Sequence, residues 1–199
     1  MPVLEKLSLD VAVEALPLAK PFRISGHVFT ESSVVVVTLS DGVYTGRGEA
    51  SGVYYLGDDV GAMRAAIEAA RPEIERGIDR ARLLEVMPAG GGRNAVDCAL
   101  WELEAKRTGR SIWDIAGLEA PRALLTTFTL GADDPAVMAA TATATGAYAQ
   151  ARALKLKLTG DLALDLARVR AVRAARPDCW MGVDANQGFG IADLPALVE

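Results

Sequence analysis

The stretch that decides the fold is residues 153–188, which read ALKLKLTGDLALDLARVRAVRAARPDCWMGVDANQG. Its first six residues alternate leucine with a small or charged residue, which is typical of a strand. An amphipathic helix follows over 162–175, and a short apolar strand over 180–183 ends at Asp184. Strand, helix and strand in this order predict a βαβ unit with parallel strands and a right-handed crossover.

The same rhythm extends on both sides of this unit. Upstream, the pattern predicts a strand over 124–130 and a helix over 135–150, and downstream it predicts the opening of another helix over 191–199. Repeated βα units indicate an open α/β sheet or a (β/α) barrel, and in both of these folds functional groups gather at the carboxyl ends of the strands.

The first part of the chain has a different organisation. Alternating apolar residues predict three strands over 7–13, 34–39 and 43–49, of which the last two are joined by an Asp-Gly turn. Helical periodicity then takes over from Asp58. We therefore expect an α+β domain over residues 1–119 and βα units with parallel strands over 120–199.

Composition narrows the class of protein. The chain has 199 residues, 51% of them apolar, and a formal net charge of −5. The sequence contains no basic block, so we expect no nucleic-acid partner, and its acidic balance does not favour an anionic membrane. Its two cysteines, Cys98 and Cys179, lack metal-ligand spacing. Without a basic, apolar leader at the N-terminus, we expect a cytoplasmic protein.

Two lysines on the strand at 153–158 are the first candidate functional residues. Alternation places Lys155 and Lys157 on the face opposite the leucines, which would turn both lysines toward the barrel interior. Burial and like-charge repulsion both favour the neutral amine, which can act as a base. An edge strand with solvated lysines explains the pattern equally well.

The second candidate is the motif Asp184-Ala185-Asn186-Gln187-Gly188 at the end of the next strand. A carboxylate there can bind a hard divalent cation, and magnesium takes one or two protein carboxylates together with water and substrate oxygens. Asp, Asn and Gly are also turn formers. The position one βα unit after the lysines favours the metal.

Other candidates are less specific. The single histidine, His27, and the pair Tyr54-Tyr55 lie in predicted loops where they could line a substrate site. Three glycines at 90–92 precede a helix and could hold a phosphate. No Lys-Ser/Thr follows them, which favours a flexible lead-in to the helix.

These motifs, taken together, resemble the muconate-lactonising-enzyme-like subgroup of the enolase superfamily, and most of all its dipeptide epimerases. The resemblance rests on the segment 87–101, the Gly-Arg-Gly-Glu stretch at 46–49, the Lys-x-Lys pair and the Asp-Ala-Asn-Gln-Gly motif, in the expected order. It implies an enolase-like α+β capping domain over residues 1–119, followed over 120–199 by the first βα units of an incomplete (β/α) barrel.

The resemblance also implies residue roles. Lys157 would transfer the proton on carbon α, Lys155 would hold positive charge beside it, and Thr129 would contact substrate. Asp184 would be the first carboxylate ligand of Mg²⁺, with Asn186 supporting it. The remaining metal carboxylates and the opposing lysine of such enzymes come from later strands.

The implied function is a magnesium-dependent dipeptide epimerase that works by 1,1-proton transfer through an enediolate, with a homo-oligomer expected. The alternatives are an N-acylamino-acid racemase, an o-succinylbenzoate synthase, a muconate cycloisomerase or an inactive remnant. Ala-Glu-specific members carry arginines in two capping-domain loops, where this chain has Gly26 and Tyr55. The resemblance therefore implies a less acidic or apolar substrate side chain.

Overall fold

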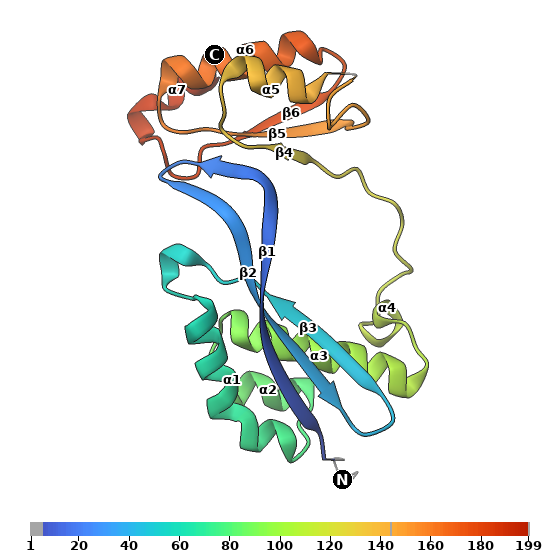
Figure 1. Ribbon diagram of the computed structural model, residues 1–199. Helices are drawn as coiled ribbons and strands as arrows, with labels where there is room; N and C mark the ends of the chain where they lie inside the picture. Colours follow the sequence, from blue (N-terminus) through green and yellow to red (C-terminus); the bar gives the residue numbers. More distant parts are fainter. Residues whose placement is uncertain (1–5, 144, 199) are drawn as a thin grey trace. The chain divides into compact units, whose positions relative to one another are not determined.

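The computed structural model describes residues 6–143 and 145–198. It divides the chain into two compact units (Figure 1). The first unit comprises Met1–Pro17 and Glu31–Arg122, and the second comprises Leu18–Thr30 and Ala123–Glu199. The segment Leu18–Thr30 thus belongs with the C-terminal part, although it lies early in the sequence. A domain boundary after residue 119 stays a prediction.

Three strands form the first sheet, in the order β1 (Ser8–Ile24), β2 (His27–Ser40) and β3 (Thr45–Ala50). The predicted meander is confirmed, and β2 pairs with β3 in antiparallel register. The strand β1 is much longer than the predicted 7–13. It continues through two prolines because it lies at the edge of the sheet, where a missing backbone donor is tolerated.

Four helices accompany this sheet: α1 (Val60–Glu75), α2 (Arg80–Val86), α3 (Gly91–Thr108) and α4 (Ile112–Ile115), with a 3-10 turn η1 (Tyr54–Leu56) before them. The carboxylates of Asp59 and Asp79 cap α1 and α2 by accepting backbone hydrogen bonds. Gly109, with φ of 66°, ends α3 in the left-handed conformation that favours glycine.

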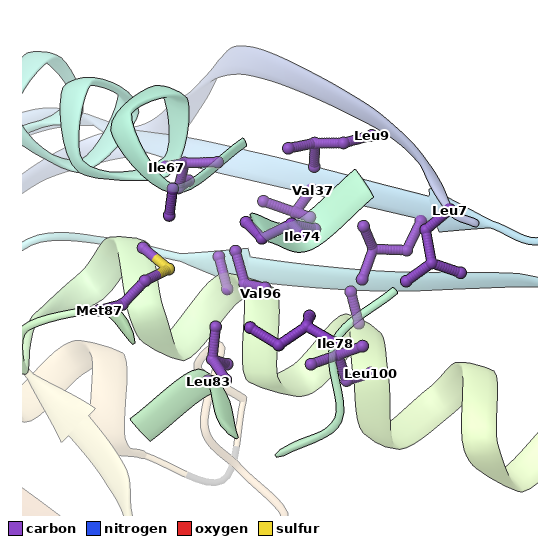
Figure 2. Packing of buried hydrophobic residues seen from close by; sticks show 14 of the residues in the cluster. Leu7, Leu9, Val37, Ile67, Ile74, Ile78, Leu83, Met87, Val96 and Leu100 are labelled. Carbon is purple, nitrogen blue, oxygen red and sulfur yellow. The ribbon is translucent and has the colours of Figure 1, made fainter. Parts of the chain in front are cut away.

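The core of the first unit lies between the sheet and these helices. Figure 2 shows apolar side chains from β1, β2, α1, α2 and α3 packed together, among them Leu9, Val37, Ile67 and Val96. Contact between β3 and α3 is especially close. A Cβ atom on Gly48 would lie 1.9 Å from the carbonyl oxygen of Ala95, so only glycine allows this approach.

The second unit contains a parallel sheet in the order β4 (Phe128–Leu130), β5 (Ala153–Lys157) and β6 (Trp180–Asp184). Its helices are α5 (Pro135–Ala142), α6 (Leu162–Ala175) and α7 (Leu194–Val198), with a 3-10 turn η2 (Ile191–Asp193). The predicted βαβ arrangement is confirmed.

Two predicted elements of this unit were too long. The strand expected over 124–130 is β4 alone, and the helix expected over 135–150 ends at Ala142. Beyond that point, the Arg176 guanidinium donates hydrogen bonds to the carbonyl oxygens of Ala142, Tyr148 and Ala151. These carbonyls therefore bind a side chain from after α6 and not the amides of a continuing helix.

The two faces of the parallel sheet differ as predicted. Leu154 and Leu156 are buried in a core with residues of α5 and α6, such as Met138 and Val172. Both lysines of β5 lie on the other face. Within the described ranges, no helix has the length and apolar character needed to cross a bilayer.

Candidate active site

The lysines of β5 and the carboxylate of β6 meet at the carboxyl end of the parallel sheet. In the β5–β6 register, Lys157 lies beside Asp184. The Nζ of Lys157 donates to Oδ2 of Asp184 at 2.7 Å, and the Nζ of Lys155 lies 3.2 Å from the same oxygen. The Lys157 side chain is 11% exposed and that of Lys155 is 37% exposed. Neither lysine is the freely solvated group of the edge-strand alternative.

These contacts determine the electrostatics of the carboxylate. The hydrogen bond from Lys157 lowers the pKa of Asp184 to about 2, with further help from the Asn186 amide and Lys155 and against the opposing effect of burial. Asp184 therefore stays an anion throughout the neutral range. An anionic oxygen between two ammonium groups can also serve a divalent cation.

Thr129 extends the same row of side chains. It is aligned with Lys155 in the β4–β5 register, and Lys155 is aligned with Gly182 of β6. Residues that pair across parallel strands share a face of the sheet. Thr129, Lys155 and Lys157 therefore lie on one face, as the substrate-contact prediction for Thr129 requires.

The turn after β6 has an unusual backbone. Asn186 and Gln187 both have positive φ, 45° and 64°, which side chains other than glycine rarely adopt. The amide of Asn186 donates to Oδ1 of Asp184 at 3.0 Å. The side-chain Oδ1 of Asn186 is buried and accepts no hydrogen bond from the residues that the structure describes. Such a buried oxygen can accept a hydrogen bond from water or substrate, or bind a cation.

Two oxygen donors after β6 are of the type that a hard divalent cation binds. Asp184 offers a carboxylate at a strand end, and Asn186 offers a buried amide oxygen beside it. Across residues 6–143 and 145–198, no three His, Cys, Asp or Glu side chains gather in one metal-binding group. The donor types fit a hard cation, and one carboxylate alone is a partial set of protein ligands.

The remaining sequence candidates are His27 and the two tyrosines. The ring of His27 packs against Phe29 at 4.3 Å between centroids, at the start of β2. Tyr55 is exposed in η1 of the first unit, and the prediction for Tyr54 concerns a side chain outside the described part. A substrate-binding role for His27 and the two tyrosines stays a prediction.

The glycines at 90–92 do not form an open phosphate cradle. The amide of Gly91, at the start of α3, donates to the carboxylate of Asp58 at 2.8 Å. This helix N-terminus therefore already binds an anion of the chain itself.

Sequence reasoning missed two polar side chains of α6, Asp165 and Arg168, which are only 1% and 6% exposed. They bind the loops that follow β4 and β5. Within a helix of alternating leucines and charges, nothing in the sequence distinguishes these two residues from solvated ones.

Residues 6–117 match the model of the mandelate racemase / muconate lactonizing enzyme N-terminal domain. This match covers more than half of the chain, and the chain belongs to this family of the enolase superfamily. The expected fold class, an enolase-like N-terminal domain followed by part of an α/β barrel, is confirmed.

Particular relatives are dipeptide epimerases. The L-Ala-D/L-Glu epimerase of Escherichia coli is 36% identical over 96% of this chain and 59% of its own length. A solved enolase family member from Agrobacterium tumefaciens with homology to dipeptide epimerases, bound to sodium and L-Ala-L-Glu, is 37% identical with a TM-score of 0.87. The alignment covers 96% of this chain and 57% of that one.

A third relative is the dipeptide epimerase of Methylococcus capsulatus, solved with Mg and the dipeptide L-Arg-D-Lys. It is 28% identical with a TM-score of 0.87, over 97% of this chain and 57% of that one. The chain therefore spans a little over half the length of the proteins it matches. The similarity to dipeptide epimerases that the sequence suggests is confirmed.

Proposed function

We propose that this chain is part of a magnesium-dependent dipeptide epimerase, an isomerase that inverts carbon α of one residue of a dipeptide by 1,1-proton transfer. The observation that carries the proposal is the contact of Lys155 and Lys157 with Asp184 at the carboxyl ends of adjacent parallel strands. Family membership supports it, and so do the dipeptide and magnesium bound in the M. capsulatus relative.

In this proposal, Lys157 removes or returns the proton on carbon α on one face of the substrate. It is the more buried of the two lysines, which limits competing exchange with water. Lys155, on the same face of β5, adds positive charge where the substrate carboxylate becomes an enediolate. Thr129 lies in line with Lys155 and would contact the substrate.

Magnesium, when bound, would stabilise the negative charge that develops on the substrate carboxylate. Asp184 would be its ligand from this chain, and Asn186 would support the ion through its buried Oδ1. Asp184 also contacts the ammonium groups of both lysines. In this proposal the same carboxylate therefore positions the acid/base and binds the metal.

The proposed substrate class depends on two positions, Gly26 and Tyr55. Gly26 and Tyr55 carry no positive charge where Ala-Glu-specific relatives carry arginine, so we propose a dipeptide with an apolar or weakly charged side chain. The two relatives associated with Ala-Glu make that dipeptide the necessary comparison.

The test is incorporation of deuterium at carbon α in heavy water, with Mg²⁺ and the intact protein that carries this chain. The panel should contain Ala-Glu, dipeptides with apolar side chains, and N-acylamino acids. Exchange at carbon α of a dipeptide is the expected result. Exchange of N-acylamino acids alone would overturn the dipeptide proposal in favour of a racemase. Exchange of Ala-Glu in preference to apolar dipeptides would overturn the substrate class only.

A further inference from the structure

Two buried, charged side chains of α6 bind each other behind the lysine strand. Asp165 is 1% exposed and Arg168 is 6% exposed. The Nη1 of Arg168 donates to Oδ1 of Asp165 at 2.6 Å. Burying two charges is costly unless their hydrogen bonds are well satisfied, so the remaining partners of this pair matter.

The carboxylate holds the turn that directly follows the lysine strand. Oδ2 of Asp165 accepts hydrogen bonds from the backbone amides of Thr159, at 2.9 Å, and Gly160, at 3.0 Å. Its Oδ1 accepts one from the hydroxyl of Thr159 at 3.2 Å. Thr159 lies two residues after Lys157, so the buried carboxylate fixes the backbone where the proposed acid/base leaves β5.

The guanidinium connects this turn with the neighbouring strand end. Nε of Arg168 donates to the carbonyl oxygen of Asp133, in the loop after β4, at 2.7 Å. Its Nη1 also donates to Oγ1 of Thr159 at 2.9 Å. The pair therefore ties together the loops that follow β4 and β5, the strands that carry Thr129 and both lysines.

The same two loops hold the turn between β1 and β2. The hydroxyl of Ser25 donates to the carbonyl oxygen of Thr159 at 3.4 Å, and the amide of Ala132 donates to the carbonyl oxygen of Arg23 at 2.9 Å. Gly26 lies at this turn with φ of 70°. The position that bears on substrate choice is thus connected to the backbone that Asp165 holds.

We propose that Asp165 and Arg168 form a positioning pair, which fixes the turn after Lys157 and thereby places that lysine beside Asp184 and substrate. The proposal rests on the proposed role of Lys157. A pair that merely stabilised α6 would have no need of two amides and a hydroxyl from another segment, yet these are the groups its carboxylate binds.

Three variants of the intact protein test this. Asp165→Asn replaces one carboxylate oxygen with a donor that faces other donors. Arg168→Lys keeps the charge and loses the fork of donors. Thr159→Val removes only the bridging hydroxyl, so it carries the test if the first two fail to fold. Arg176→Lys is the matched control, because Arg176 is also a buried arginine of this unit but binds carbonyls at Ala142 and Ala151.

The first readout is hydrogen exchange of the backbone amides of residues 159 and 160, each relative to the intrinsic rate of its own residue type. We expect exchange to rise at least tenfold in Asp165→Asn and Arg168→Lys, to rise at residue 160 in Thr159→Val, and to stay unchanged in the control. The second readout is acetylation of Lys157 at one pH, measured by mass spectrometry relative to Lys106 of the other unit. We expect the relative labelling to change at least threefold in the test variants only.

The two readouts test the positioning role of Asp165 and Arg168 without any substrate. Lower resistance to urea with unchanged exchange at Thr159 and Gly160 would overturn the proposal, as would faster exchange with unchanged labelling of Lys157. Should no dipeptide exchange its α-proton, the proposed function would fail while these readouts still reported on the pair. Where the enzyme is active, we expect kcat to fall at least tenfold in Asp165→Asn and to remain within threefold in Arg176→Lys.

Discussion

Lys157 and Asp184 are 27 residues apart in the chain, and the Nζ of the first donates to Oδ2 of the second at 2.7 Å. The β5–β6 register aligns them, so the contact follows directly from the parallel pairing of the strands. Lys155 lies two residues earlier on the same face of β5, and its Nζ is 3.2 Å from the same oxygen. The proposed site is therefore organised around one carboxylate oxygen.

Replacing Lys157 by methionine should nearly abolish exchange of the α-proton in the deuterium assay. Removal of a positioned acid/base typically lowers a rate by about 10²–10⁴-fold. Lys155→Met should have a smaller effect because that side chain is more exposed and farther from Asp184. Lys106→Met, a lysine that pairs with Glu102 in the first unit, is the control and should leave the rate unchanged. Equal losses in all three variants would contradict this assignment.

Removing magnesium should stop exchange, and adding it back should restore it. Asn186→Ala should weaken magnesium binding by about 10–100-fold, the usual effect of losing a group that supports a metal ligand. Asp184→Asn should weaken it more, because it removes the ligand itself. Calorimetric titration with Mg²⁺ measures both. Asp178→Asn, which alters a carboxylate paired with Arg176, should bind the metal as the wild type does; equal weakening there would refute the assignment.

Gly48→Ala should destabilise the first unit severely. The new Cβ would lie 1.9 Å from the carbonyl oxygen of Ala95 and 2.7 Å from the amide of Ala99, and both are backbone atoms of α3. Overpacking of this kind costs roughly 1–3 kcal/mol or more. Glu49→Ala, at the exposed neighbouring position of β3, should change the free energy of unfolding by less than about 0.5 kcal/mol. Urea unfolding followed by circular dichroism compares the two variants.

Asp41 should make stability depend on pH in the acid range. The backbone amide of Tyr44 donates to its carboxylate at 2.7 Å, and Arg107 binds it at 2.5 Å; together with the Val43 amide they lower the pKa of Asp41 to about 2. Because the unfolded chain takes up this proton near pH ~4, the stabilisation is fully present above that pH and is lost as the pH falls toward 2.

The measurement is urea unfolding of wild type and Asp41→Asn at pH 7, 5 and 3. We expect the wild type to be more stable at pH 7 and 5, and the difference to narrow at pH 3. Asparagine keeps an acceptor for the two backbone amides and removes only the charge that Arg107 binds. A difference that grew as the pH fell would show that the sign is wrong.

Much of the barrel part could be predicted from local pattern. The alternation of leucine and lysine identified β5 and its two faces, because a strand places successive side chains on opposite sides. The helix predicted over 162–175 has these same bounds in the structure, because its apolar periodicity begins and ends with the helix. The end of α5 was not, because Arg176 binds carbonyls at and beyond Ala142 through contacts distant in sequence. The start of β4 was not either, because the strand begins only at Phe128, where its pairing with β5 begins.

The sequence by itself determined the order of the strands and helices, the face on which Lys155 and Lys157 lie, and the motif that ends in Asp184. These follow from side-chain period and turn chemistry, which act over a few residues. Only the tertiary structure decided that Asp184 would contact both lysines, that the Oδ1 of Asn186 would be buried, and that Asp165 and Arg168 would hold the turn after Lys157. Such contacts join residues from separate strands and helices, and their geometry depends on how those elements pack.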